Sequence, residues 1–337
     1  MRYSKVFLDA VGYELAPDVV ASSALEERVA PVYRALGMQA GQLEALTGIR
    51  ERRWWEPGFP LSEGAIRAGR KALSAGNVQA RDLGALIYAG VCREASEPAT
   101  ACAVAHALGA GPACAVYDLS NACLGVMNAI FELANAIEIG AMRAGLVVSC
   151  ESAREINDSM IASMLQNPSM EHFRLSIATL TGGSGAVGVL VTDGSFGRQG
   201  RRLLGGLCRT APQHYGLCRW HRDSMSTDAA AVLKHGVALG RETWRAFLKD
   251  MGWSAGSVDK TICHQVGAPH RSQVLSEMGV PLDKDFQTYE YLGNIGTVSL
   301  PLTAAIAEER GFLEKGDKVA FLGIGSGLNC LMLGWEW

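Results

Sequence analysis

Residues 118–125 read Asp-Leu-Ser-Asn-Ala-Cys-Leu-Gly and mark a direct step from a β-strand into an apolar helix. The spacing predicts a strand over 115–119 and a long helix over 124–139. A cysteine just before a helix lies at the positive end of the helix dipole, which lowers the thiol pKa and favours the thiolate. Cys123 is therefore the candidate nucleophile. Taken alone, a cysteine among small residues is more often a buried core residue.

The pattern on either side of this step alternates strands with helices, as in α/β proteins. The first half predicts helices over 64–75 and 98–108 and strands over 83–89, 145–149 and 185–191. The second half predicts helices over 229–249, 269–278 and 299–311 and strands over 260–264, 318–322 and 329–334.

The two halves share one order of elements, which suggests a duplicated α/β unit. We expect a first half over residues 1–195 and a second over 196–337, with the ligand site where they meet. Residues 151–180 and 198–226 fit neither half, so we expect them to be insertions that cap a pocket.

Composition excludes several classes of function. Of 337 residues, 48% are hydrophobic and 19% charged, and the formal net charge is −3, with no basic stripe. Such a chain suits a large core and does not favour binding to nucleic acid. No apolar run reaches the roughly 18 residues of a membrane span, and the N-terminus lacks a signal-peptide pattern, so a cytoplasmic protein is expected.

The nine cysteines include no C-x-x-C pair. This pattern argues against a disulfide framework and against a zinc or iron–sulfur site, so no metal is expected. Apart from Cys123, the cysteines are expected to be reduced core residues.

Three further segments carry polar groups that suit catalysis. His264 ends a strand, at the edge where open α/β sheets bind ligands. Asn294 lies in Gly-Asn-Ile-Gly, and Ser326 lies in Gly-Ile-Gly-Ser-Gly after a late strand, where backbone N–H groups are able to approach a substrate oxygen. Each signal is weak alone, because a structural histidine and a turn asparagine are the commoner roles.

Together, in this order, the motifs resemble the thiolase superfamily, and most closely the ketoacyl synthase III type of condensing enzyme. The run Thr-Gly-Ile-Arg-Glu-Arg at residues 47–52 also matches that type. The resemblance implies a layered α-β-α-β-α fold of two βαβαβ halves, a homodimer, and an acyl thioester as substrate without a further cofactor. It also implies that Cys123 is acylated, that His264 and Asn294 hydrogen-bond the enolate oxygen, and that the amides of Cys123 and Ser326 form an oxyanion hole.

Glu97 distinguishes two reactions within this family. Starter enzymes of fatty-acid synthesis decarboxylate a malonyl thioester, whereas a condensation of two ordinary acyl thioesters needs a base. Glu97 lies 26 residues before Cys123, in Glu-Pro-Ala-Thr. By composition alone it is a helix N-terminal carboxylate facing water. The segment nevertheless resembles the OleA-type thiolases, which join two long-chain acyl-CoA molecules head to head, and in which the matching glutamate acts as base from the partner subunit.

Alternatives remain open at this point. They are a decarboxylative 3-oxoacyl-ACP synthase III, a non-catalytic family member and a papain-type hydrolase, with acyl carrier protein as an alternative acyl donor.

Gln42 replaces the aromatic residue that stacks on adenine in the starter enzymes. We expect Arg50, Arg52 and Trp54 to contact CoA. Flexible apolar residues of the two insertions are expected to line an alkyl tunnel, with core packing as the alternative: Met160, Ile161, Met164, Leu165, Phe173, Leu203, Leu204 and Leu207.

Overall fold

The computed structural model describes residues 1–337 apart from 197–199 and 222. Its nine-stranded sheet has the order β11-β12-β13-β8-β1-β7-β6-β4-β5. Strands β1 and β8 pair only at Phe7 and Leu8, so the sheet divides there into two halves. The strands of the first half are β1 (Phe7–Leu15), β4 (Ala85–Ala89), β5 (Ala115–Leu119), β6 (Ala144–Glu151) and β7 (Gly185–Thr192). Those of the second are β8 (Arg201–Thr210), β11 (Lys260–Cys263), β12 (Lys318–Gly325) and β13 (Asn329–Glu336).

Strand pairing repeats between the halves. In the first, β4 lies parallel to β5 and β6, while β7 is antiparallel to β6 and β1. In the second, β11 lies parallel to β12, and β13 is antiparallel to β12 and β8. A parallel bridge from Thr261 of β11 to Asp285 takes the place that β5 has in the first half. The expected duplication is confirmed, and the expected boundary after residue 195 falls between β7 and β8.

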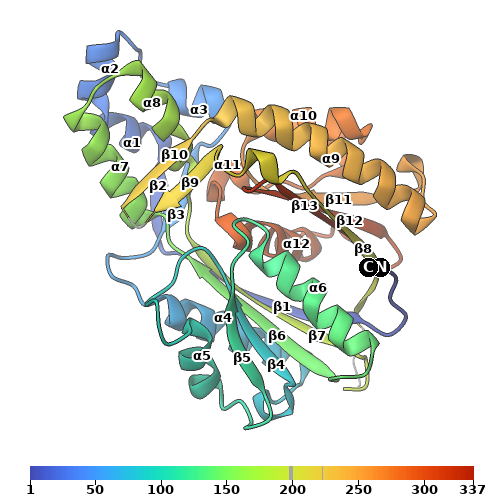
Figure 1. Ribbon diagram of the computed structural model, residues 1–337. Helices are drawn as coiled ribbons and strands as arrows, with labels where there is room; N and C mark the ends of the chain where they lie inside the picture. The colour runs from blue at the N-terminus through green and yellow to red at the C-terminus, as the bar shows by residue number, and fades with distance from the viewer. Residues whose placement is uncertain (197–199, 222) are drawn as a thin grey trace.

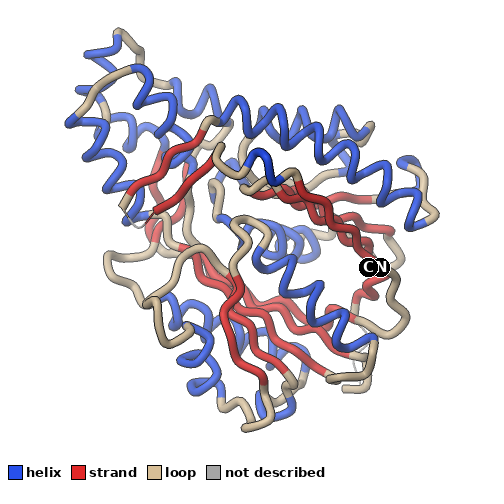
Figure 2. Tube along the Cα trace, viewed as in Figure 1, coloured by secondary structure: helices blue, strands red, loops and turns tan. Residues whose placement is uncertain are grey.

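Helices form three layers around the two half-sheets (Figures 1 and 2). Helices α4 (Leu61–Gly76) and α5 (Thr100–Leu108) cover the outer face of the first half-sheet, and α9 (Ala229–Met251) and α10 (Ala268–Met278) that of the second. Helices α6 (Gly125–Glu138) and α12 (Ser299–Glu309) lie between them in the largest core cluster. Residues 299–307 of α12 are all buried, as expected for a helix enclosed on every side. The layered α-β-α-β-α fold is thus confirmed.

The expectation for residues 198–226 was wrong in part. Residues 201–210 form β8, which is a central strand of the sheet, while residues 198, 199 and 222 lie outside the described residues. The strand contains Gly205 and Gly206, which in a sequence read as a break. A Cβ at Gly206 would lie 2.6 Å from Leu333 and 2.9 Å from Phe131, so close packing excludes a side chain there. Among the described residues of 198–226, the hairpin of β9 (Cys218–His221) and β10 (Ser224–Thr227) lies outside the nine-stranded sheet, as expected for an insertion.

A cap covers one end of the two half-sheets, at the upper left of Figure 1. It consists of α1 (Ser22–Arg28), α2 (Ala30–Leu36), α3 (Gln42–Thr47), α7 (Arg154–Gln166), α8 (Met170–Ser176) and the small sheet of β2 (Asp18–Ala21) and β3 (Glu51–Trp54). Its apolar core includes Ile161, Met164 and Phe173. These residues pack the interior of the cap, which agrees with the core-packing alternative and not with an alkyl tunnel. Leu203 likewise packs in the largest core cluster, and Leu165 is exposed.

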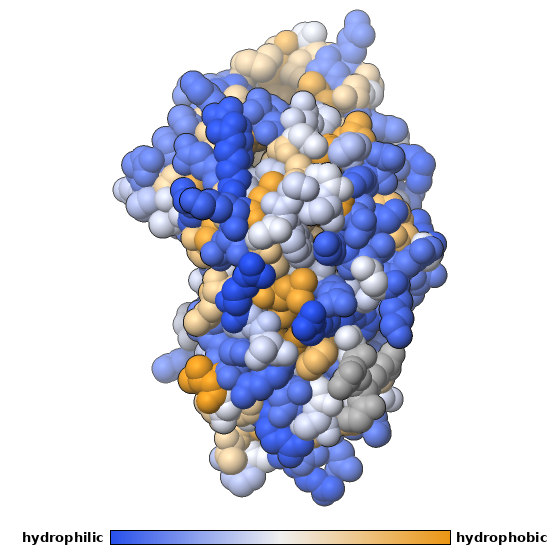
Figure 3. Space-filling view, turned by 90° about the vertical axis from the view of Figure 1, so that its right-hand side faces the viewer, coloured by the Kyte–Doolittle hydropathy of each residue, from blue (hydrophilic) through white to orange (hydrophobic). Residues whose placement is uncertain are grey.

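Polar side chains cover most of the face shown in Figure 3, and apolar side chains appear there in small groups. Within the described part of the chain, no helix is both long and apolar enough to cross a membrane. The same residues contain no cluster of three or more metal-ligating side chains.

Candidate active site

Cys123 lies in a tight turn between β5 and α6. Helix α6 begins at Gly125 with Leu124 as its N-cap, and the amide of Leu124 donates to the carbonyl of Asn121 at 2.9 Å. Ala122 adopts a left-handed conformation with φ of 45°, which side-chain-bearing residues rarely adopt. Such local strain is typical of functional turns. The left-handed conformation of Ala122 turns the backbone just before Cys123, which lies on a cavity wall.

Hydrogen bonds connect this turn to both halves of the fold. The side-chain amide of Asn329 donates to Asn121 at 3.0 Å, and Asn121 donates to Asn128 at 2.7 Å. The amide of Val126 donates to the Thr297 hydroxyl at 2.6 Å. The Cys123 turn is therefore fixed against the segment that follows Asn294.

The prediction of a lowered pKa for Cys123 was wrong. Burial, together with smaller effects of the nearby Cys218 and Glu151, raises the pKa of this thiol to about 12. A buried thiolate loses its hydration, and a neighbouring carboxylate opposes a second negative charge. At neutral pH the Cys123 thiol is therefore protonated, so any reaction in which its sulfur attacks has to move this proton.

His264 follows β11 and is 3% exposed. Its backbone amide donates to Leu322 at 3.0 Å, whereas neither ring nitrogen has a hydrogen-bond partner among the described residues. Burial, with a smaller effect of His270, lowers the pKa of His264 to about 3. The imidazole is therefore neutral at neutral pH, and it is able to accept a proton or donate a hydrogen bond.

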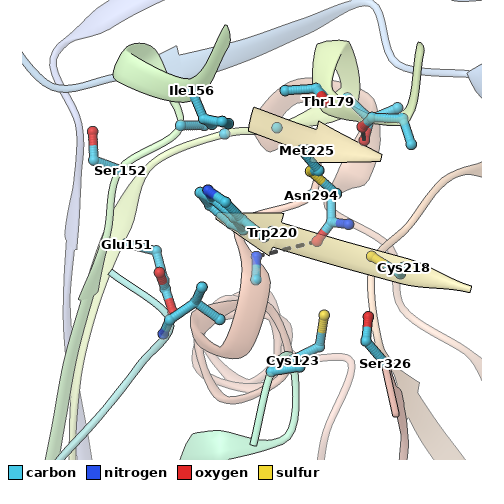
Figure 4. A pocket seen from close by; sticks show the side chains of 18 of the residues that line it. Cys123, Glu151, Ser152, Ile156, Thr179, Cys218, Trp220, Met225, Asn294 and Ser326 are labelled. Carbon is cyan, nitrogen blue, oxygen red and sulfur yellow. Dashed lines mark hydrogen bonds between the residues drawn. The ribbon is translucent and has the colours of Figure 1, made fainter. Parts of the chain in front are cut away.

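Asn294 is oriented by its own turn. Its Oδ1 accepts the amide of Gly296 at 3.1 Å, the dashed line in Figure 4. The Nδ2 group is thereby left to donate into the cavity. Gly296 has φ of 57°, and a Cβ there would lie 3.4 Å from Cγ of Glu151. Glycine suits this position on both counts.

Two cavities meet at Cys123. The first, of about 260 Å³, extends between the cap and Glu151, and Val91, Ile156 and Gly182 also line it. The second, of about 350 Å³, extends past His264 toward Leu46 and Thr47, and Leu233 and Val266 also line it. Cys123, Cys218, Asn294 and Ser326 line both. A reacting group at Cys123 therefore has space on two sides.

The structure brings four of the predicted catalytic residues together. Cys123, Asn294 and Ser326 share both cavities, and His264 lines the second. The Gly325–Ser326 loop lies against the Cys123 turn. A Cβ placed on Gly325 would be 3.6 Å from the Cys123 amide nitrogen.

Glu97 lies elsewhere in this chain. It is exposed, in residues 93–98 before α5, and it is not among the described residues that line the two cavities.

Two of the predicted CoA contacts have other positions. Arg52 is fully buried, and its guanidinium donates to Ser22 and to the carbonyls of Val20 and Leu180. Trp54 is 2% exposed and donates to the carbonyl of Gly182 at 3.1 Å. Both therefore stabilise the cap, in contrast to the prediction, because the β3 strand alternates inward and outward residues and these two point inward. Arg50 is exposed.

Sequence reasoning missed several cavity residues. Glu151 ends a strand at the same edge as the nucleophile, a signal that was available. Cys218, Trp220 and Met225 come from the β9–β10 hairpin and give no such signal (Figure 4). The expectation that the other cysteines are core residues holds for Cys150, Cys263 and Cys330, but Cys102 and Cys208 are exposed. All nine cysteines are free thiols.

Comparison with known proteins gives consistent results. A family model described as 3-oxoacyl-[acyl-carrier-protein (ACP)] synthase III C terminal matches residues 248–337. A protein named acyl-CoA:acyl-CoA alkyltransferase from Shewanella oneidensis is 54% identical over 349 residues, covering 100% of both chains. One of the same name from Xanthomonas campestris is 33% identical over 338 residues, again covering 100% of both. A beta-ketoacyl-[acyl-carrier-protein] synthase III from Bacillus pumilus is 27% identical and covers 86% of this chain and 88% of that protein.

Solved structures agree with this. A cysteine-to-alanine variant of Xanthomonas campestris OleA superimposes with a TM-score of 0.97 at 33% identity, covering 100% of this chain and 98% of that one. A cysteine-to-serine variant of the same enzyme, described with bound lauric acid and lauroyl-CoA, has a TM-score of 0.96 and covers 99% of this chain and 100% of that one.

Proposed function

Because the chain belongs to the acyl-CoA:acyl-CoA alkyltransferase (OleA) family of thiolase-like condensing enzymes, we propose that it joins two long-chain acyl-CoA molecules. The reaction is a Claisen condensation without decarboxylation, and it gives a 2-alkyl-3-ketoacyl product. The decarboxylative synthase III relatives are more distant, at 27% identity against 54%.

The observation that carries this proposal is the meeting of two cavities at one cysteine. An acyl group held on Cys123 needs space for its alkyl chain, and a second thioester must approach the same carbon from another direction. The first cavity extends toward the cap and the second past His264 to the exposed Leu46. The second cavity therefore suits the arm of an acyl-CoA whose charged nucleotide stays in water.

In the first half-reaction the sulfur of Cys123 attacks the thioester carbonyl and CoA leaves. The thiol begins protonated, and the neutral imidazole of His264 is the base on the cavity wall that is able to take the proton and pass it to the CoA sulfur. The amides of Cys123 and Ser326 stabilise the oxyanion that forms during the attack.

In the second half-reaction a base removes an α-proton of a second acyl-CoA. His264 and Asn294 donate hydrogen bonds to the resulting enolate oxygen, and the orientation of Asn294 by Gly296 supports this role. The enolate carbon attacks the acyl-cysteine, a carbon–carbon bond forms, and the Cys123 thiolate leaves and recovers a proton. Hydrolysis of the remaining thioester releases the product.

We assign the base to Glu97 of a second copy in a homodimer. Glu97 is exposed in its own chain, in a segment next to β5 at the end of the sheet. Asp118 of β5 accepts the amides of Thr100 and Ala101 at 3.0 and 2.9 Å, which fixes the start of α5 beside that segment. Among the described residues no strand pairs with the outer edge of β5, and pairing of this edge with a second copy would bring the two 93–98 segments to the subunit interface.

The remaining assignments are that the enzyme needs no cofactor, uses acyl-CoA rather than acyl carrier protein, and works in the cytoplasm. Cysteine, histidine, asparagine and glutamate supply every group that the reaction requires. Nine free thiols suit a reducing compartment.

The exposed Arg50, near the mouth of the second cavity at Thr47, is the remaining candidate for a CoA phosphate contact.

The test is a product analysis. The purified protein is incubated with dodecanoyl-CoA alone and with dodecanoyl-CoA plus malonyl-CoA, and the products are identified by mass spectrometry. A β-ketoacid of doubled chain length, or its ketone, from dodecanoyl-CoA alone is expected. A strict requirement for malonyl-CoA would contradict the proposal.

A further inference from the structure

Glu151 is a buried carboxylate that the reaction described above does not use. It is the last residue of β6, is 4% exposed, and lines the first cavity together with Cys123 (Figure 4). Burial raises its pKa, while hydrogen bonds from the Cys92 side chain and from the backbone amides of Val91 and Cys92 act in the opposite direction. Burying a charged carboxylate costs free energy unless hydrogen bonds compensate for the lost hydration, so the partners of Glu151 indicate its role.

The hydrogen bonds of Glu151 are made to one turn of the backbone. Its Oε1 accepts the amide of Val91 at 2.8 Å, and its Oε2 accepts the amide of Cys92 at 3.1 Å. The hydroxyl of Tyr88 donates to the carbonyls of Cys92 and Cys150, at 2.9 and 2.8 Å. Residue 92 is thus held through both its amide and its carbonyl.

This turn is where the chain leaves the cavity wall. Val91 still lines the first cavity, whereas residues 93–98, which include Glu97, are exposed. The conformation at residues 91 and 92 sets the start of that segment, and Glu151 accepts the amides of both; further along, Glu94 accepts the amide and hydroxyl of Ser62, each at 2.8 Å.

We propose that Glu151 is a positioning residue for carbon–carbon bond formation, holding the turn at residues 91–92 so that Glu97 reaches the active site of the partner subunit. The inference rests on the proposed function. Its main consequence falls on the condensation step, since the turn of Cys123 and the His264 strand are held by other elements, and the exchange of the 91–92 amides separates this role from the packing of Glu151 on Gly296 beside Asn294.

Replacement of Glu151 by glutamine should affect the two half-reactions differently. A glutamine side chain has one acceptor oxygen, and its NH₂ group faces the second backbone amide without accepting it. Condensation should fall about tenfold or more, the loss expected when an acceptor is removed from a charge-assisted hydrogen bond. Acylation of Cys123 should stay the same or become faster, because removal of the nearby negative charge lowers the thiol pKa.

The experiment compares wild type, E151Q and E155Q. Glu155 is a matched control, since it is exposed and, within the described part of the chain, accepts a hydrogen bond from Ser152 alone, at 2.6 Å. Acylation is followed as the acyl adduct on the intact protein after mixing with dodecanoyl-CoA, condensation as the coupled product, and the turn by hydrogen–deuterium exchange. We expect slower condensation, unimpaired acylation and faster exchange at residues 91–97 in E151Q, with E155Q like wild type.

A proportional loss of both half-reactions, or unchanged exchange at residues 91 and 92, would overturn the inference. If E151Q does not fold, Y88F serves as the second variant, because it removes the hydrogen bond to the carbonyl of Cys92. Y88F should likewise slow condensation and leave acylation unimpaired. A wild-type protein that forms the acyl adduct but no coupled product would contradict the proposed function, and the exchange measurement then decides by itself whether Glu151 holds the turn.

Discussion

Glu97 and Cys123 lie in different positions of one chain, and the proposal that they act together across a dimer is testable by pairing defective subunits. One chain carries C123A and the other E97A, and the two are co-expressed with different affinity tags so that mixed dimers can be isolated. In such a dimer the E97A chain keeps Cys123, His264 and Asn294 and receives Glu97 from its partner. The C123A chain has no nucleophile.

One of the two sites is therefore complete, and the mixed dimer should show about half of the wild-type condensation rate per dimer. Each parent homodimer should be inactive in condensation. The assay is the coupled product formed from dodecanoyl-CoA, measured by mass spectrometry against an internal standard.

The matched control places the same two substitutions on one chain and pairs it with a wild-type chain. If Glu97 acts in trans, the wild-type chain then lacks a base, and this dimer should be inactive. If Glu97 acted within its own chain, the wild-type chain would be complete and the pattern would reverse. The assignment would be refuted by an active control dimer together with an inactive test dimer, in which C123A and E97A are on separate chains.

Three further outcomes follow from the site and the cap. Burial lowers the pKa of His264 to about 3 and of His270 to about 4 from the usual 6.5, so the unfolded chain binds more protons than the native chain at intermediate pH. The free energy of unfolding should therefore decrease as the pH falls below about 6.5, by up to about 1.4 kcal/mol per pH unit for each histidine, and a flat denaturation profile between pH 7 and 5 would contradict this. N294A should slow condensation by at least about tenfold through loss of an enolate hydrogen bond, while the acyl adduct still forms; equal losses in the two steps would argue against the role. R52M should lower the free energy of unfolding by about 2–4 kcal/mol, because it leaves the carbonyls of Val20 and Leu180 and the Ser22 hydroxyl without their donor, and an unchanged melting temperature would refute its structural role.

The sequence predicted the elements that carry local signals. Strand β5 was predicted at its observed bounds and α6 within one residue at each end, because a short β-rich run and a long apolar helix meet there. Strand β8 was missed, since its two glycines are required by close contacts with Phe131 and Leu333 that come from distant parts of the chain.

The site divides in the same way. Cys123, His264, Asn294 and Ser326 were found from motifs, and the structure places them on shared cavities. The thiol pKa was predicted in the wrong direction, because the helix dipole is a local effect whereas burial and the charge of Glu151 arise only after folding. Arg52 and Trp54 were misassigned because the inward side of β3 is set by the cap that packs on it.

The two ends of the sheet differ in a way that bears on assembly. At one end no described strand pairs with the outer edge of β5, whereas at the other Asp285 covers β11, bridged to Thr261 and held by Arg271 at 2.7 Å. A protein with two open edges is able to add copies at each and grow into a fibre. Here the duplication has kept a full edge strand in one half only. In the proposed dimer, two copies that pair through β5 would use their open edges on each other, and polymerisation would stop at the dimer.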